Sequence, residues 1–223
     1  MGLVGCIGTT GEDRVKRLRS SERGASAVEA ALVTPLLLLL VFGIVEMSML
    51  MRDTVATTSS VRTGARTASV SAGAGPGTCQ ASANPPPCSP ANAPALAQAA
   101  ADAIQRAGSA MPKNNIRWLM VYDANTSGYP LPAGNTNLSC VTKCVTYVWD
   151  AGLNKFRYAS GSWTSSTINA CVNDPAREAV GIAMLAHHPM ITGLFGRGVD
   201  ITERSVMQFE PLTTDTCQAG AHS

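Results

Sequence analysis

The feature that most constrains this chain is an apolar run near its N-terminus, bounded by two glutamates. No charged residue lies between Glu29 and Glu46, so the run is the 16 residues Ala30–Val45. A helix of that length covers about 24 Å, whereas the hydrocarbon core of a membrane is about 30 Å thick. A full span must extend back to Ala25 or forward to Met51, which places one glutamate at membrane depth. Because a carboxylate in lipid is costly, either glutamate is a candidate functional residue.

The segment before the run is basic and predicts the topology of the chain. Cytoplasmic flanks of membrane helices are enriched in lysine and arginine. We therefore expect a single-pass protein of the cell membrane, with a cytoplasmic N-terminus and an extracytoplasmic domain after about Met51. The basic residues that set this orientation are Arg14, Lys16, Arg17, Arg19 and Arg23.

The charge of the remaining chain argues against a nucleic-acid partner. The whole chain has 17 lysines and arginines and 15 aspartates and glutamates. The first 24 residues hold five of the basic and three of the acidic residues, which leaves 12 of each. Binding to phosphates requires a clustered basic footprint, and a neutral balance does not predict one.

The junction between the basic segment and the apolar run carries a short motif. A glycine is followed five residues later by a glutamate, and a leucine run with an early proline comes next. The residues that form this pattern are Arg23, Gly24, Ala25, Ala27, Val28, Glu29, Pro35 and Leu36 to Leu40. The pattern resembles the class III signal of type IV pilin-like proteins, and it is most similar to the TadE-like family of the Flp/Tad pilus system.

The resemblance implies a function and a role for three residues. TadE-like proteins are minor pilins (pseudopilins) that take part in pilus assembly and surface adhesion after cleavage by a prepilin peptidase. Gly24 would precede the scissile bond, and Ala25 would become the new N-terminus. Glu29 would pair with the free amine of a neighbouring subunit, which offsets the cost of a carboxylate in lipid. The implied partners are the membrane, the peptidase, other pilin or pseudopilin subunits and the Tad assembly machinery.

Two other classes of protein remain open at this point. One is an uncleaved single-pass membrane protein with an exported, disulfide-stapled binding domain. The other is an anchored exported enzyme. We expect no enzyme, no cofactor and no metal, because the sequence contains no Gly-x-Ser-x-Gly, Walker or His-Glu-x-x-His motif. Adjacent His187 and His188 on a strand would point to opposite faces, which does not suit one metal ion.

The cysteines agree with an exported domain. The chain has seven, of which Cys6 precedes the apolar run and six follow it. An even number in an oxidising compartment predicts up to three disulfides with 15 possible pairings. Cys79 with Cys88 is the local choice, because it would close a proline-rich loop. The other candidates are Cys140, Cys144, Cys171 and Cys217.

The fold class that the pattern predicts is α+β, a pilin-like ectodomain behind a long N-terminal helix. We expect a leader over 1–24, a transmembrane and extended helix over 25–70, a Gly/Pro-rich linker over 71–94 and an α+β domain over 95–223. Along 46–70 the periodicity indicates one amphipathic stripe, formed by Met51, Val55, Thr58, Val61, Ala65 and Ala68.

Within the domain the pattern predicts one helix packed on an antiparallel sheet. The helix is expected over 95–108 and the strands over 115–122, 140–150, 154–159, 178–189 and 199–211. The last two strands, joined by a His-Pro corner and a short apolar turn, resemble the C-terminal half of TadE-like ectodomains.

Overall fold

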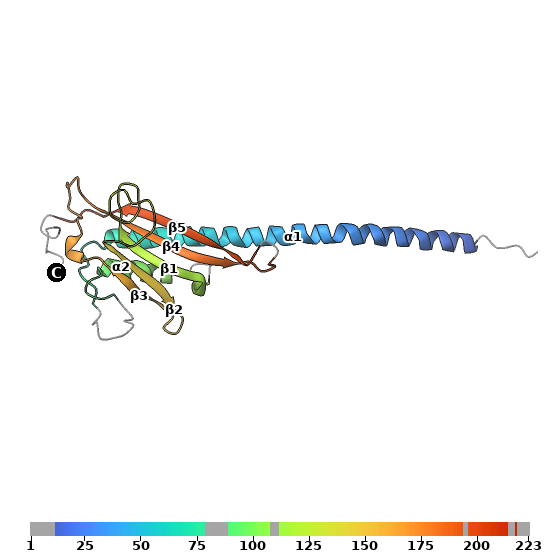
Figure 1. Cartoon of the computed structure of the whole chain (residues 1–223), viewed down its shortest axis with the longest axis horizontal. Helices are drawn as coiled ribbons and strands as arrows, with labels where there is room; N and C mark the ends of the chain where they lie inside the picture. The colour runs from blue at the N-terminus through green and yellow to red at the C-terminus, as the bar shows by residue number, and fades with distance from the viewer. Residues whose placement is uncertain (1–11, 79–88, 108–111, 194–195, 214–216, 218–223) are drawn as a thin grey trace, which may run out of the picture. The chain divides into compact units, whose positions relative to one another are not determined.

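The computed structural model describes residues 12–78, 89–107, 112–193, 196–213 and 217, with side chains from Gly24 onward. The chain divides between Ser48 and Met49 into two compact units. The first unit holds the N-terminal part of one long helix. The second holds the rest of that helix and an α+β domain (Figure 1).

The long helix, α1, extends from Glu12 to Val70. Its end agrees with the sequence prediction, and it begins earlier than the predicted start at Ala25. Apolar and small residues without a β-branched majority favour the helix, and Pro35 is the proline inside it. The helix ends where the glycine-rich segment begins, and Gly75 there adopts a positive φ of 74°.

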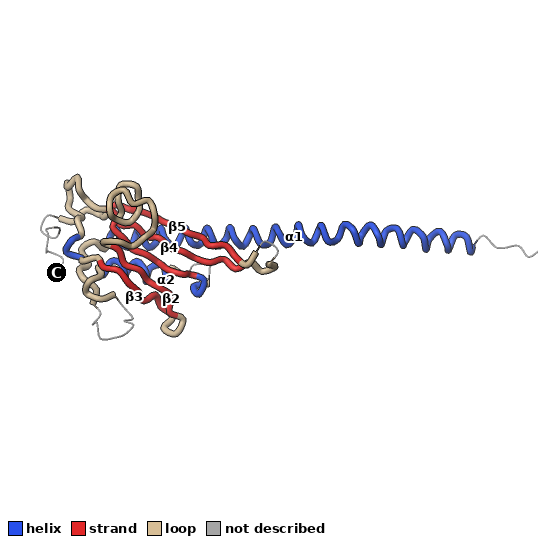
Figure 2. The backbone as a smooth tube through the Cα atoms, in the orientation of Figure 1, coloured by secondary structure: helices blue, strands red, loops and turns tan. Residues whose placement is uncertain are grey.

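The domain is built on one five-stranded antiparallel sheet (Figure 2). Its spatial order is β3-β2-β1-β4-β5, and every neighbouring pair is antiparallel. The predicted α+β class is therefore confirmed. The strands are β1 (Ile116–Asp123), β2 (Cys144–Asp150), β3 (Lys155–Ser162), β4 (Ala179–Pro189) and β5 (Gly198–Gln208). Short 3-10 helices are η1 (Lys113–Asn115) and η2 (Ser165–Thr167).

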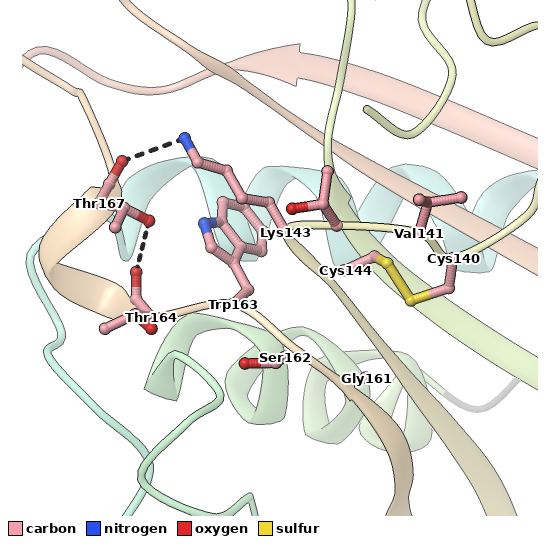
Figure 3. Close-up of a pocket in the computed structure, with 10 residues that line it drawn as sticks. Cys140, Val141, Lys143, Cys144, Gly161, Ser162, Trp163, Thr164 and Thr167 are labelled. Atoms are coloured by element: carbon pink, nitrogen blue, oxygen red, sulfur yellow. Dashed lines mark hydrogen bonds between the residues drawn. A yellow bond between two sulfur atoms is a disulfide. The ribbon is translucent and has the colours of Figure 1, made fainter. Parts of the chain in front are cut away.

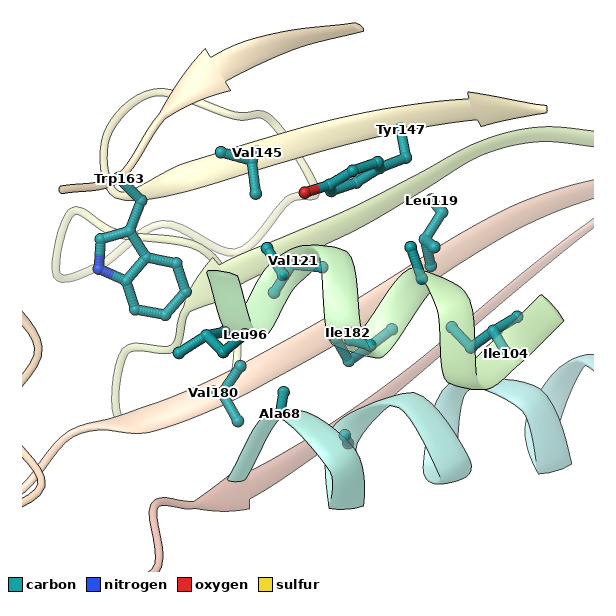
Figure 4. Close-up of a cluster of buried hydrophobic side chains, with 14 of the residues drawn as sticks. Ala68, Leu96, Ile104, Leu119, Val121, Val145, Tyr147, Trp163, Val180 and Ile182 are labelled. Atoms are coloured by element: carbon teal, nitrogen blue, oxygen red, sulfur yellow. The ribbon is translucent and has the colours of Figure 1, made fainter. Parts of the chain in front are cut away.

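One face of the sheet, the inner face, carries the main hydrophobic core (Figure 4). Side chains alternate along each strand, so every second residue points to this face. Two helices cover it: α2 (Ala95–Arg106) and the second half of α1. The buried residues that meet there include Val61 and Ala65 of α1, Leu96 and Ile104 of α2, and Leu119, Val121, Val145, Val180 and Ile182 of the sheet.

The buried face of α1 differs from the predicted stripe in its first half. Val61, Ala65 and Ala68 are buried as expected, but Met51 and Val55 are 63% and 68% exposed. In their place Asp53 and Ala56 face the domain. The contact of Asp53 with His188 on β4 turns this side of the helix toward the domain, so Met51 and Val55 lie on the outward side.

The opposite, outer face of the sheet is partly covered by the long loop 124–143. A second, smaller cluster forms beneath it from Met120, Tyr122, Cys144 and Ala183. Tyr122 donates its hydroxyl to the carbonyl of Gly128 at 3.0 Å, which ties the loop to β1. The guanidinium of Arg204 on β5 lies 3.7 Å from the ring centroid of Tyr129 in the same loop.

The two ends of the domain are different in character. One end holds the connection 151–154, the end of β4 with residues 190–193, and residues 196–197 before β5, and we call this the hairpin end (Figure 2). Helix α1 enters there, because Asp53 contacts His188 near the end of β4. At the other end, the loop end, the amide of Glu210 donates to the carbonyl of Ser69, close to the end of α1.

The predicted linker 71–94 is packed on the domain where the structure describes it. The amide of Gly77 donates to the carbonyl of Ala93 at 2.7 Å, and Ala72 and Ala93 are buried. Ser89 is hydrogen-bonded to the hydroxyl of buried Tyr147. The middle of the segment, with Cys79 and Cys88, lies outside the described residues, and so does the predicted pairing of these cysteines.

Candidate functional site

The three residues singled out by the sequence motif lie on one continuous stretch of α1. Gly24, Ala25 and Glu29 are all helical and all exposed. A methyl group built at Gly24 would meet no atom within 4 Å, so nothing in the fold requires glycine at this position. The second candidate glutamate is different, because Glu46 is only 3% exposed. The structure therefore leaves Glu29 accessible and buries Glu46.

The apolar segment between these glutamates is almost wholly exposed. Leu32 and Leu36 are 75% and 70% exposed, and no residue in the most apolar window of the helix is buried. A row of exposed leucines is unfavourable in water but is what lipid requires. By length and composition α1 can cross a membrane over part of Gly24–Val70.

These features can be compared with known families. Residues 24–66 match the family model described as TadE-like protein. The match confirms the resemblance seen in the sequence, and it begins at Gly24, the first residue of the glycine-glutamate motif. We call residues 24–66 the TadE-like segment. The comparison with curated proteins gave no match, and neither did the comparison with solved structures.

The TadE-like segment extends past the apolar run into the α+β domain. Its last two turns supply Val61 and Ala65 to the core. The whole five-stranded sheet, α2 and both described disulfides lie after residue 66 and outside the match. The match therefore covers the apolar run and the start of the domain, and it does not extend to the surface of the sheet.

Four of the predicted disulfide cysteines are paired in the structure. Cys140 is bonded to Cys144, and Cys171 is bonded to Cys217. The first bond closes the base of the loop 124–143, and the second fixes the C-terminal segment that follows β5. In the first case the sequence separation is only 4 residues, whereas in the second it is 46. Both bonds lie in the part of the chain predicted to be exported.

A partly buried charge cluster at the loop end was not predicted from the sequence. Lys143 donates to Asp123 at 3.1 Å and also contacts the carboxylate of Glu178. Its ammonium reaches the carbonyl of Thr167 as well, at 3.3 Å. Asp123 is 2% exposed at the end of β1. The cluster joins β1, the end of the long loop, η2 and the residue before β4.

The environment shifts the pKa values of this cluster. Burial raises the pKa of Asp123 to about 7, and the negative charge of Glu178 adds to the rise, while Lys143 opposes it. Burial alone would lower the pKa of Lys143, but its hydrogen bonds and charge attraction to Glu178 and Asp123 raise it. The cluster is thus a lysine held by two carboxylates, one of which is poised to bind a proton near neutral pH.

An open pocket of about 400 Å³ lies beside this cluster (Figure 3). Its walls include the Cys140–Cys144 disulfide, the buried indole of Trp163 and the hydroxyl-bearing side chains Thr142, Ser162, Thr164 and Thr167. Lys143 lines the pocket, but its ammonium is engaged with Asp123, Glu178 and Thr167. The pocket is open to solvent, and both polar and apolar groups line it.

The two adjacent histidines each have a carboxylate partner on opposite sides of β4. His187 Nδ1 lies 2.7 Å from Asp200 on β5, and His188 Nδ1 lies 2.7 Å from Asp53 on α1. The first pair is at the surface, whereas the second is buried. Neither histidine lines the pocket beside Trp163 or the one beside Trp149. Within the described ranges no group of three or more His, Cys, Asp or Glu side chains could hold a metal ion.

Proposed function

We propose that this protein is a membrane-anchored minor pilin, or pseudopilin, of a Flp/Tad pilus system. The observation that carries the proposal is the position of Gly24, Ala25 and Glu29, exposed at the start of an apolar helix within the TadE-like segment. In this scheme a prepilin peptidase cuts between Gly24 and Ala25, the apolar run holds the protein in the cell membrane, and the α+β domain lies outside.

Glu29 would pair with the new N-terminal ammonium of a neighbouring subunit. A carboxylate in lipid without a partner is costly, and an ammonium at similar depth offsets that cost. The exposure of Glu29 on α1 supports this role, because the side chain is available to another chain. The partners would be other pilin or pseudopilin subunits and the Tad assembly machinery, and the assembled structure would serve surface adhesion.

The first test is the N-terminal residue of the protein purified from its native membrane, by intact mass. We expect a start at Ala25. A Gly24→Leu variant should keep the membrane helix, because a side chain at this position meets no neighbouring atom, and it should retain the leader. Ala31→Leu places the same side chain at another exposed helical position and should be cleaved normally. A native protein that starts at Met1 would leave an uncleaved anchored domain and refute the peptidase step.

The second test separates assembly from insertion. Glu29→Ala should leave membrane insertion intact and abolish incorporation into pili. Pilus yield and carbonate-resistant membrane association would be measured together. Normal pili in this variant would remove the role of Glu29.

A further inference from the structure

The charges at the hairpin end of the domain are unbalanced toward the positive. Its carboxylates are already partnered: Asp53 with His188, Asp150 with Arg157, and Asp200 with His187. Several cations there form no ion pair with a described carboxylate. They come from the end of α2, the start of β1, the start of β3 and the connection before β5, and they are Arg106, Arg117, Lys155 and Arg197.

The same end carries exposed apolar side chains on both hairpin connections. Leu153, between β2 and β3, is 53% exposed, and Ile191, between β4 and β5, is 67% exposed. In the sequence, Lys155 follows Leu153 by two positions, and Arg197 follows Ile191 by six positions in the same connection. The half-buried Trp149 stands beside the first connection, with the Lys113 ammonium 5.1 Å from its ring centroid. Exposed apolar side chains surrounded by lysines and arginines suit a membrane surface. The apolar side chains can enter the boundary between headgroups and acyl chains, and the cations can contact anionic headgroups.

Chain connectivity brings this end of the domain to the membrane. The apolar run of α1 ends at Val45, and the domain unit begins at Met49. Within that unit, Asp53 contacts His188 of β4, one residue before the strand ends. The hairpin end is therefore the end of the domain that the chain reaches first after the proposed membrane anchor. The loop end lies at the far side, beyond the last turns of α1.

We propose that the hairpin end of the domain docks on the anionic headgroups of the membrane that holds the α1 anchor. The four unpaired cations supply the attraction, and Leu153 and Ile191 enter the headgroup boundary. Docking fixes the orientation of the domain on the bilayer before the protein joins any assembly. The inference rests on the proposed membrane anchor and adds a second contact between the protein and the lipid.

The test uses the full chain reconstituted in vesicles that contain phosphatidylcholine brominated near the headgroup, with or without phosphatidylglycerol. A tryptophan probe is introduced at Leu153→Trp or Ile191→Trp. The matched control is Val141→Trp, a 68% exposed position at the loop end. The three native tryptophans are common to all variants, and their signal is subtracted with the unsubstituted protein. The measured quantity is quenching of the added tryptophan by bromine.

With phosphatidylglycerol present, we expect at least twofold more quenching at Leu153→Trp and Ile191→Trp than at Val141→Trp. The difference should shrink without anionic lipid and in 1 M salt, which screens charges beyond about 3 Å. Each cation near an anionic surface strengthens binding about fivefold, so Arg117→Gln with Lys155→Gln should lower the docked-to-free ratio about 25-fold. The charge-matched control, Arg62→Gln with Arg66→Gln on the exposed side of α1, should leave it unchanged.

Equal quenching at the two ends in anionic vesicles would overturn the docking. A difference that is insensitive to lipid charge and salt would overturn the role of the cations. Flotation of the vesicles is scored in the same samples. A chain that does not float with them would refute the anchor itself, whereas a floating chain without the difference refutes only the docking.

Discussion

The buried pair His188–Asp53 should be the most consequential polar contact between α1 and the sheet. Its nitrogen and oxygen are 2.7 Å apart, and the two side chains are only 5% and 11% exposed. Removing one partner from a buried pair leaves the other in a poorly solvated place, which typically costs about 3–5 kcal/mol. His188 Nε2 is also buried and has no hydrogen-bond partner among the described atoms. Among the described residues, no second hydrogen bond of the His188 ring would compensate for the loss of Asp53.

We expect Asp53→Ala and His188→Ala each to lower the free energy of unfolding by about 3 kcal/mol. For a domain of this size that corresponds to a fall in Tm of about 6–12 °C. The adjacent residue provides the control. His187 has the same nitrogen–oxygen distance of 2.7 Å to Asp200, but the Asp200 side chain is 61% exposed. An exposed pair contributes about 0–1 kcal/mol, so His187→Ala should shift Tm by only about 0–4 °C.

The assay is thermal unfolding of the full chain in detergent, followed by near-UV circular dichroism, with the double variant included. If the two side chains act through each other, Asp53→Ala with His188→Ala should cost less than the sum of the single variants by about 1–3 kcal/mol. Two results would refute the reasoning. One is additivity of the two single costs within about 0.5 kcal/mol, and the other is an equal loss for His187→Ala and His188→Ala.

Three further predictions concern the interior of the domain and its disulfides. Burial raises the pKa of Asp123 in the folded state from 3.8 to about 7, so the stability that its protonation gives is fully present below pH 3.8 and is lost as the pH rises to 7. Between these pH values the free energy of unfolding should fall by at most about 1.4 kcal/mol per pH unit. Asp123→Asn should flatten this slope in thermal melts from pH 4 to 8. Gly181→Ala would place a methyl carbon 2.2 Å from the buried Tyr122 ring and should lower the free energy of unfolding by about 1–3 kcal/mol. This loss should largely disappear when Gly181→Ala is made in a Tyr122→Leu background. An equal loss in both backgrounds would exclude the clash. Replacing both cysteines of Cys171–Cys217 by serine should lower the free energy of unfolding by about 4 kcal/mol, against about 2 kcal/mol for Cys140–Cys144. The reason is that the first disulfide closes a loop of 46 residues and the second a loop of only 4. Denaturant midpoints that rank in the reverse order would contradict the loop-entropy argument.

Elements with a strong local period were predictable from the sequence. The helix α2 and all five strands lie within a few residues of their expected bounds, because each combines alternation or a 3.6-residue repeat with glycine or proline at its ends. The TadE-like segment was also recognisable, since its signal lies in a contiguous motif at a junction of charge and hydrophobicity.

Contacts between distant segments could not be read in the same way. The Asp123–Lys143–Glu178 cluster joins residues that are 20 and 35 positions apart, and no local pattern links them. One signal was available, because Asp123 ends an apolar strand where a charge needs a partner. Asp53 contacts His188, which is 135 residues away in the sequence. Which side of α1 is buried in this part of the helix is therefore set by the position of β4, which the local sequence does not reveal.

The error in the predicted stripe shows what determines the buried side of α1. The three- and four-residue spacing selected Met51 and Val55, yet Asp53 and Ala56 are the residues that are buried in this part of the helix. A Cβ at Gly64 would lie 2.7 Å from Ile104 Cδ1 of α2, so the helices approach too closely there for a larger side chain without a shift. Close packing, rather than maximal apolar area, therefore selects this face. It leaves Met51 and Val55 exposed on the outward side of the helix.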